Sequence, residues 1–114
     1  MSLPITIDTV RQLALALPEV TEGVCFGTPA FYVRKKLLAR LREDGDTLAI
    51  KADYAEREFW MLAKPKTFFL TDHYVGSPMM LIRLATVQQA DLQTLLSQAW
   101  RMIAPKRLLK SVED

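Results

Sequence analysis

Apolar and polar residues alternate in two ways along this chain, and the first pattern predicts a helix from about Asp8 to Leu17. Apolar residues such as Val10 and Leu13 recur at three- and four-residue spacing, which places them on one helix face. Thr6 or Asp8 can cap the N–H groups of the first turn, and Pro18 ends the helix because it has no N–H to donate. We therefore expect an amphipathic helix that packs on a neighbouring layer.

The next segment has a two-residue period that predicts strands between residues 24 and 51. Short apolar and aromatic segments at 24–26, 30–34 and 36–42 are separated by turn-forming residues. Asp44-Gly45 is typical of a hairpin turn, because these residues tolerate positive φ angles. The returning strand is Thr47 to Lys51. In the segment 36–42 we expect Leu37, Ala39 and Leu41 on the covered face of the sheet, and Leu38, Arg40 and Arg42 on the other.

Two capping-box spacings mark the starts of two further helices. Asp53 and Glu56 predict a short helix that ends near Ala63. Thr86 and Gln89 predict a final helix that ends before a proline. Two apolar segments between these helices, 67–70 and 79–84, are predicted strands.

The predicted order is therefore helix, strands, short helix, strands, helix. Short connections between successive strands favour an antiparallel sheet. Two helices with one apolar stripe each can cover one sheet face, so the other face is expected in solvent. We predict a single α+β domain over residues 1–114: a two-layer sandwich whose mainly antiparallel sheet has the N- and C-terminal helices and a short helix between strands on one face. We expect frayed ends near residues 1–5 and 106–114.

Composition and charge narrow the function classes. The 114 residues include 15 Lys and Arg against 13 Asp and Glu, and the net charge of +2 excludes a histone-like polycation but permits a local basic patch. No apolar run approaches the roughly 20 residues that span a bilayer, and Met1–Thr6 lacks a signal-peptide pattern. A single cysteine excludes an internal disulfide and fits a reducing compartment. We expect a cytoplasmic protein with no membrane partner.

Few residues of this chain could carry out catalysis. The single histidine, His73, follows Asp72, but adjacent side chains of an extended segment point in opposite directions, so this carboxylate is poorly placed to orient the imidazole. Cys25 lies between apolar residues and is expected to pack as a small hydrophobe, with a reactive thiolate as the alternative. We therefore expect no catalytic site, no cofactor and no metal site, and hence a non-enzymatic protein.

The strand pattern gathers cations on the sheet face that the helices leave open. Cations can neutralise phosphates, and an aromatic side chain beside them can stack on a base. The alternative reading is a solvated face whose basic side chains keep the sheet soluble, and the acidic hairpin tip would repel phosphate. The predicted nucleic-acid site comprises Tyr32, Arg34, Lys35, Lys36, Arg40, Arg42, Lys51 and Arg83.

Two other surfaces give alternatives to this site. Three cations follow the final helix in residues 106–110, where the helix dipole favours them by roughly 0.3–1 kcal/mol each, so a structural role is expected ahead of a DNA-binding tail. Met79 and Leu81, together with Leu38, fall on the predicted open face. If they are exposed together, the chain would be a protein–protein or small-ligand module, and a homodimer becomes credible.

Five stretches of the chain match the motifs of a known family, in the family's order. They are Leu13-Ala-Leu-Ala-Leu-Pro18 followed by Glu22, then Phe26-Gly-Thr-Pro-Ala-Phe-Tyr-Val33, Glu56-Arg57-Glu58, Thr71-Asp-His-Tyr-Val-Gly-Ser-Pro-Met-Met-Leu-Ile-Arg-Leu84 and Ala99-Trp100-Arg101. On these motifs the chain resembles the MmcQ/YjbR family of small bacterial proteins. One departure is Phe26, where the family often has Trp.

The resemblance implies a fold similar to CyaY, the bacterial frataxin, and DNA binding through the β-rich half. It implies no reaction. Frataxins would suggest iron binding through an acidic first helix, but Asp8 is the only acidic residue of the predicted first helix here. Because iron requires several ligands gathered together, iron binding is not expected.

Overall fold

The computed structural model describes residues 4–113, with side chains described up to residue 110. Its helices are α1 (Ile7–Leu15), α2 (Tyr54–Ala63), the 3₁₀ turn η1 (Asp72–Tyr74), α3 (Gln89–Ile103) and α4 (Lys106–Glu113). Its strands are β1 (Val20–Cys25), β2 (Thr28–Val33), β3 (Lys36–Leu41), β4 (Thr47–Lys51), β5 (Phe68–Phe69) and β6 (Met79–Arg83). In the described part of the chain, no helix is long and apolar enough to cross a membrane.

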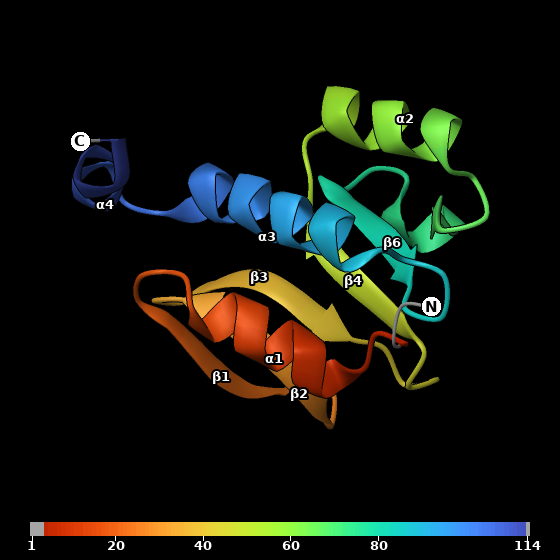
Figure 1. The fold of residues 1–114 in the computed structure, drawn as a ribbon, viewed down its shortest axis with the longest axis horizontal. Helices are drawn as coiled ribbons and strands as arrows, with labels where there is room; N and C mark the ends of the chain where they lie inside the picture. Colours follow the sequence, from red (N-terminus) through yellow and green to blue (C-terminus); the bar gives the residue numbers. More distant parts are fainter. Residues whose placement is uncertain (1–3, 114) are drawn as a thin grey trace.

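The strands form one antiparallel sheet in the order β1-β2-β3-β4-β6-β5. Helices α1 and α3 lie side by side on one face of it, α1 against β1 and α3 against β3 and β4 (Figure 1). Helix α2 packs beside β5 and β6 at the far edge. The α+β sandwich predicted from the sequence is confirmed. We call the face under α1 and α3 the first face and the opposite face the second face.

The main core lies between the first face and the two long helices. Phe31, Ile50 and Met80 of the sheet are fully buried in the same apolar cluster as the buried side chains of α3. Trp100 of α3 is also buried, and its Nε1–H donates to the Pro18 carbonyl at 2.9 Å, which ties α3 to the segment after α1. The helix faces predicted from three- and four-residue spacing are the faces that pack.

One of the two predicted capping boxes is correct in its first half, and the other does not form. The Asp53 carboxylate accepts from the Glu56 N–H at 2.8 Å and starts α2 where expected. Thr86 does not cap α3, whose N-cap is Gln88. The Thr86 hydroxyl instead forms a hydrogen bond with the Thr67 hydroxyl at 2.9 Å, because the tertiary structure offers it a partner across the sheet edge.

Strand β3 departs from the predicted alternation at a bulge. Phe31 pairs with Ala39 and Tyr32 pairs with Leu37, so Leu38 is an extra residue between them. Leu38 is therefore fully buried in the main core, and its predicted place on the open face is wrong. Leu37, predicted on the covered face, packs on the second face instead. One extra residue shifts the alternation, so the side chains on one side of the bulge lie on the face opposite to the expected one.

The second face is partly covered by the segment 70–78. Tyr74 packs there against Ala49, Met79 and Leu81 in a second apolar cluster. Met79 and Leu81 lie on the second face but are not exposed together, since Leu81 is 0% exposed and Met79 is 7% exposed, so the condition for a partner surface formed by them is not met. The sequence pattern could not show this, because it assigns side chains to a face but not the loop that crosses it.

Arg57 of α2 holds this covering segment in place. The buried guanidinium donates to four carbonyls: Nη1 to Tyr74 at 3.1 Å, Ser77 at 2.7 Å and Met79 at 3.1 Å, and Nη2 to Val75 at 2.7 Å. The Tyr74 and Ser77 carbonyls also accept from backbone N–H groups, those of Ser77 and Met79, so the guanidinium adds charged donors to a turn that is already hydrogen-bonded. Together with the Tyr54 hydroxyl, which donates to the Gly76 carbonyl at 3.1 Å, Arg57 therefore ties the cover over the second face to α2.

Fraying of the two ends stays a prediction, and the structure describes most of both ends. Residues 106–113 form α4, and Leu108 packs into the main core. Ile5 is also part of that core. Residues 1–3 and 114 lie outside the described residues.

Candidate nucleic-acid interface

The structure divides the eight predicted site residues between two regions. Three of them, at 34–36, lie at the turn between β2 and β3, where Arg34 has a positive φ of 58°. The other five lie on or beside the second face, and they are Tyr32, Arg40, Arg42, Lys51 and Arg83.

Arg40 is the most enclosed of the second-face cations. Its side chain is buried, and Nη2 lies 3.4 Å from a Glu43 carboxylate oxygen. Its guanidinium carbon lies 5.2 Å from the centre of the Phe26 ring. Burial opposes the charge of Arg40, but Tyr74, Glu43 and Cys25 outweigh it and raise the pKa of the guanidinium. The charge of Arg40 therefore already interacts with Glu43 and with the Phe26 ring of the protein itself.

The neighbouring second-face arginines stack on aromatic rings of the protein. The Arg42 guanidinium lies 5.6 Å from the centre of the Tyr74 ring, and that of Arg83 lies 4.0 Å from the Phe69 ring. Asp44 stands close to Arg42 at the hairpin tip. Its pKa is below the usual range, chiefly because the Asp46 N–H donates to it, with further help from Thr47 and from the charge of Arg42. An ionised acid therefore borders this group of arginines.

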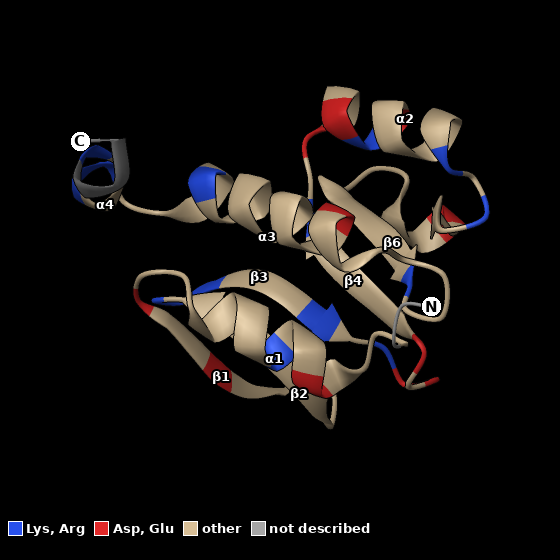
Figure 2. Ribbon diagram, in the orientation of Figure 1, with Lys and Arg blue, Asp and Glu red and all other residues tan. Residues whose placement is uncertain are grey.

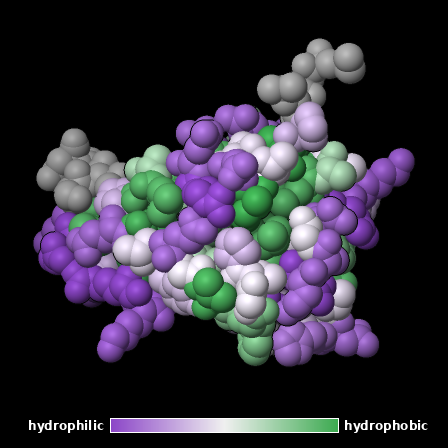
Figure 3. Space-filling view, turned by 90° about the horizontal axis from the view of Figure 1, so that it is seen from below, coloured by the Kyte–Doolittle hydropathy of each residue, from purple (hydrophilic) through white to green (hydrophobic). Residues whose placement is uncertain are grey.

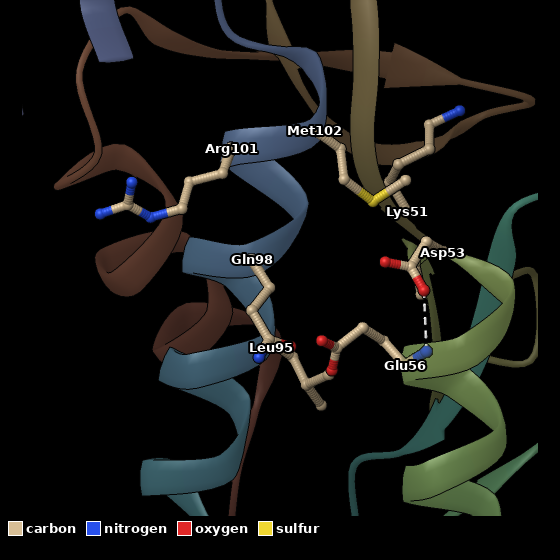
Figure 4. Close-up of a pocket in the computed structure, with 8 residues that line it drawn as sticks. Lys51, Asp53, Glu56, Leu95, Gln98, Arg101 and Met102 are labelled. Atoms are coloured by element: carbon tan, nitrogen blue, oxygen red, sulfur yellow. Dashed lines mark hydrogen bonds between the residues drawn. The ribbon is translucent and has the colours of Figure 1, made fainter. Parts of the chain in front are cut away.

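The last of the predicted cations, Lys51, borders a cavity between α2 and α3. This cavity has a volume of about 260 Å³ and is lined by Lys51, Ala52, Asp53, Glu56, Leu95, Gln98, Arg101 and Met102. The Asp53 and Glu56 carboxylates face it, whereas Nζ of Lys51 points away (Figure 4). Because Asp53 caps α2, at least one of these acids has a structural role.

A different concentration of cations lies where the β2–β3 turn meets α4. Arg34 and Arg107 both reach the Glu19 carboxylate, at 3.4 Å and 3.3 Å, so residues far apart in sequence share one partner. Figure 2 shows Lys and Arg on α4 and at the adjoining end of β3. We define the basic end of the molecule as Arg34, Lys35, Lys36, Lys106, Arg107 and Lys110.

The basic end carries more charge than its own contacts neutralise. Lys35, Lys36, Lys106 and Lys110 are exposed. Within the described residues none of these four lysines forms an ion pair with a carboxylate. Hydrophilic residues crowd the same end in the space-filling view, at the left of Figure 3. Sequence reasoning found both halves of this cluster but kept them apart, because no local pattern shows that a turn and a distant helix meet.

A hollow lies within the basic end. It has a volume of about 470 Å³ and lies between the β2–β3 turn and the junction of α3 and α4. Three cations, Arg34, Lys35 and Lys36, contribute to its lining. The remaining lining residues are apolar, and they are Val33, Ile103 and Pro105.

The residues considered for catalysis or metal binding are separate from the basic end. His73 is exposed in η1, with its ring centre 4.9 Å from that of Tyr74. Cys25 is half-buried near Tyr32, whose pKa is raised by burial and by this thiol. Among the residues that the structure describes, no three His, Cys, Asp or Glu side chains come together in a group that could hold a metal ion.

Comparisons with known proteins identify relatives without an assigned activity. The chain is 35% identical over 68 residues to the uncharacterised proteins Mb2600 of Mycobacterium bovis and Rv2570 of Mycobacterium tuberculosis. This match covers 59% of the chain and 53% of each relative, so the chain spans about half the length of these relatives.

A solved structure has the same fold. The crystal structure of Deinococcus radiodurans protein DR2400, with the family-model domain DUF419, superposes with a TM-score of 0.74 at 24% identity. The superposition covers 90% of this chain and 80% of that one. The YjbR family model matches residues 15–102, from the end of α1 to the last turn of α3. The chain therefore belongs to the YjbR family.

Proposed function

We propose that this protein binds nucleic acid, and that it does so through the basic end. The observation that carries the proposal is the meeting of two cationic segments around a single carboxylate, Glu19. Binding a polyanion releases counterions in proportion to the cations that contact phosphates. The four lysines, which have no ion-pair partner among the described side chains, therefore favour such a ligand.

The second face supports nucleic-acid binding less well. Its arginines stack on Phe26, Tyr74 and Phe69, and Arg40 is also paired with Glu43. A phosphate would have to compete with these contacts and with the charge of the hairpin acids. Among the side chains that the structure describes, no carboxylate pairs with Lys35, Lys36, Lys106 or Lys110, so a phosphate meets no such competition there.

Fluorescence anisotropy with a labelled 20-nucleotide oligo(dT) tests this proposal. Two triple variants of equal charge change separate the regions: K35E/K36E/R107E at the basic end and R42E/K51E/R83E at the second face. For four to six phosphate contacts, we expect wild-type affinity to fall roughly 100-fold between 50 and 200 mM salt.

The two variants should behave differently in this assay. At 50 mM salt we expect the basic-end variant to bind about 100-fold more weakly than wild type, and the second-face variant to stay within about threefold. Loss of binding in the second-face variant alone would place the interface on the second face instead. Wild-type protein that does not bind at 50 mM salt would refute the proposal.

A second candidate function is small-ligand binding in the cavity between α2 and α3. One observation favours it: the Gln98 amide oxygen is buried beside this cavity, and within the described residues no donor reaches it. A buried acceptor without a partner is costly, and a ligand N–H could supply the missing bond. A thermal-shift screen of small amines and amides, repeated with Gln98→Met, tests it. Stabilisation that disappears in the variant supports the candidate, and no stabilisation of wild type refutes it.

A further inference from the structure

The hollow in the basic end combines two properties that select a particular class of polyanion. Its rim carries Arg34, Lys35 and Lys36, and its lining includes Val33, Ile103 and Pro105. Val33 is 1% exposed and Ile103 is 7% exposed, so they form a floor beneath the charged turn. A ligand that fills the hollow must therefore have an anionic part and an apolar part.

The volume of the hollow suits a small organic group. Its volume of about 470 Å³ lies within the range of roughly 300–1,000 Å³ that holds small organic groups in proteins. Its apolar lining is aliphatic, and Pro105 is the only half-buried member, so the proline ring supplies most of the apolar surface that a ligand could reach. A nucleobase could bury a flat apolar face there while its phosphates stay at the charged rim.

From this arrangement we infer that the basic end binds single-stranded nucleic acid in preference to duplex, with an unpaired base in the hollow. This inference rests on the proposed function. In a duplex the bases are stacked inside the helix, and extruding one costs a few kcal/mol. In a single strand the bases are available, and burial of a base against the aliphatic lining adds to the charge attraction without requiring a given sequence.

Base binding in the hollow can be distinguished from binding by charge alone, because only the first depends on the bases of the strand. A strand of 20 abasic deoxyribose phosphates has the phosphates of oligo(dT) but no bases. If a base occupies the hollow and buries about 50 Å² of apolar surface, oligo(dT) should bind about tenfold more tightly than the abasic strand at equal salt. If only the cations matter, the two strands should bind equally.

A variant that fills the hollow gives a second test. Pro105→Trp places a bulky side chain in the lining and leaves all six cations of the basic end unchanged. The matched control is Pro65→Trp, because Pro65 is an exposed proline of the α2–β5 loop. We expect Pro105→Trp to reduce oligo(dT) affinity to that of the abasic strand, with abasic binding unchanged, and the control to match wild type.

Fluorescence anisotropy with oligo(dT), the abasic strand and a 20-base-pair duplex distinguishes the outcomes. Tighter oligo(dT) binding that is lost in Pro105→Trp confirms the inference. Equal, salt-dependent binding of oligo(dT) and the abasic strand overturns it but leaves the proposed function standing. Binding of none of the three overturns both. If Pro105→Trp does not fold, which circular dichroism would show, the abasic comparison with wild-type protein alone decides.

Discussion

The two cationic regions of this protein contain similar residues in different surroundings. On the second face, Arg40 is buried beside Glu43, and Arg42 and Arg83 lie over aromatic rings. At the basic end, Lys35 and Lys36 extend from a turn into solvent. A sheet face brings neighbouring strands about 4.8 Å apart, so its side chains find partners within the protein. Side chains at a turn or at the start of a helix are not held this close to neighbours, so their cations stay available to a ligand.

The largest effect should come from removing the anchor of the second-face cover. Arg57→Met removes four charge-assisted hydrogen bonds to the 74–79 carbonyls, of which, among the described residues, only those of Tyr74 and Ser77 keep a donor from the turn itself. We expect the free energy of unfolding to fall by about 3–5 kcal/mol. Urea denaturation measures this loss.

A second arginine variant serves as the control for Arg57→Met. Arg107→Met changes an exposed arginine and should alter the free energy of unfolding by no more than about 0.5 kcal/mol. An equal loss in both variants would show that Arg57 does not anchor the cover.

The bulge in β3 gives the next largest effect. Leu38 is fully buried, whereas Leu37 is half-buried at the edge of the second-face cluster. Leu38→Ala should lower the free energy of unfolding by about 2–5 kcal/mol, and Leu37→Ala by about 1 kcal/mol. Chemical denaturation of the two variants compares them directly. A larger loss in Leu37→Ala would mean that the simple alternation is correct and the bulge is absent.

Removing the shared carboxylate should strengthen the basic end. Glu19→Gln releases Arg34 and Arg107 from their ion pairs, so oligo(dT) should bind about two- to fivefold more tightly at 50 mM salt. Stability should change by less than about 1 kcal/mol, because exposed ion pairs contribute little. Anisotropy measures the affinity, with Glu58→Gln on α2 as the control of equal charge change. Equal gains in both variants would indicate an effect of net charge alone.

The smallest effect concerns the acidic tip beside the second face. The pKa of Asp44 is lowered in the folded protein, so this carboxylate stabilises the fold above its unfolded pKa, and the contribution is lost as pH falls through the folded pKa. We expect wild type to have a higher Tm than Asp44→Asn at pH 6, and the difference to shrink as pH falls below about 4. Calorimetry across this pH range measures it. A Tm difference that does not change with pH would contradict this role.

Much of the fold follows from local patterns. The helix faces and the hairpin around Asp44-Gly45 were predictable, because each depends on residues close in sequence. The strand Thr47–Lys51 has the predicted bounds. Leu37 and Leu38 lie on the faces opposite to those predicted because of one bulge, and no residue type in this segment predicts a bulge.

The candidate site was only partly predictable. Lys35 and Lys36 were included from the sequence, but their meeting with α4 depends on how α3 crosses the sheet. The cover over the second face depends on Arg57, which appeared in the sequence only as part of a family motif. Contacts between distant segments decide which cations remain available, and a two-residue period carries no information about them.

Titration of ¹⁵N-labelled protein with oligo(dT), followed by amide chemical shifts, tests most directly whether the basic end is the interface. We predict that the largest shifts fall in residues 33–36 and 103–110, which surround the hollow and its cations. Shifts concentrated instead at Arg40, Arg42 and Arg83 would contradict the account and return the interface to the second face.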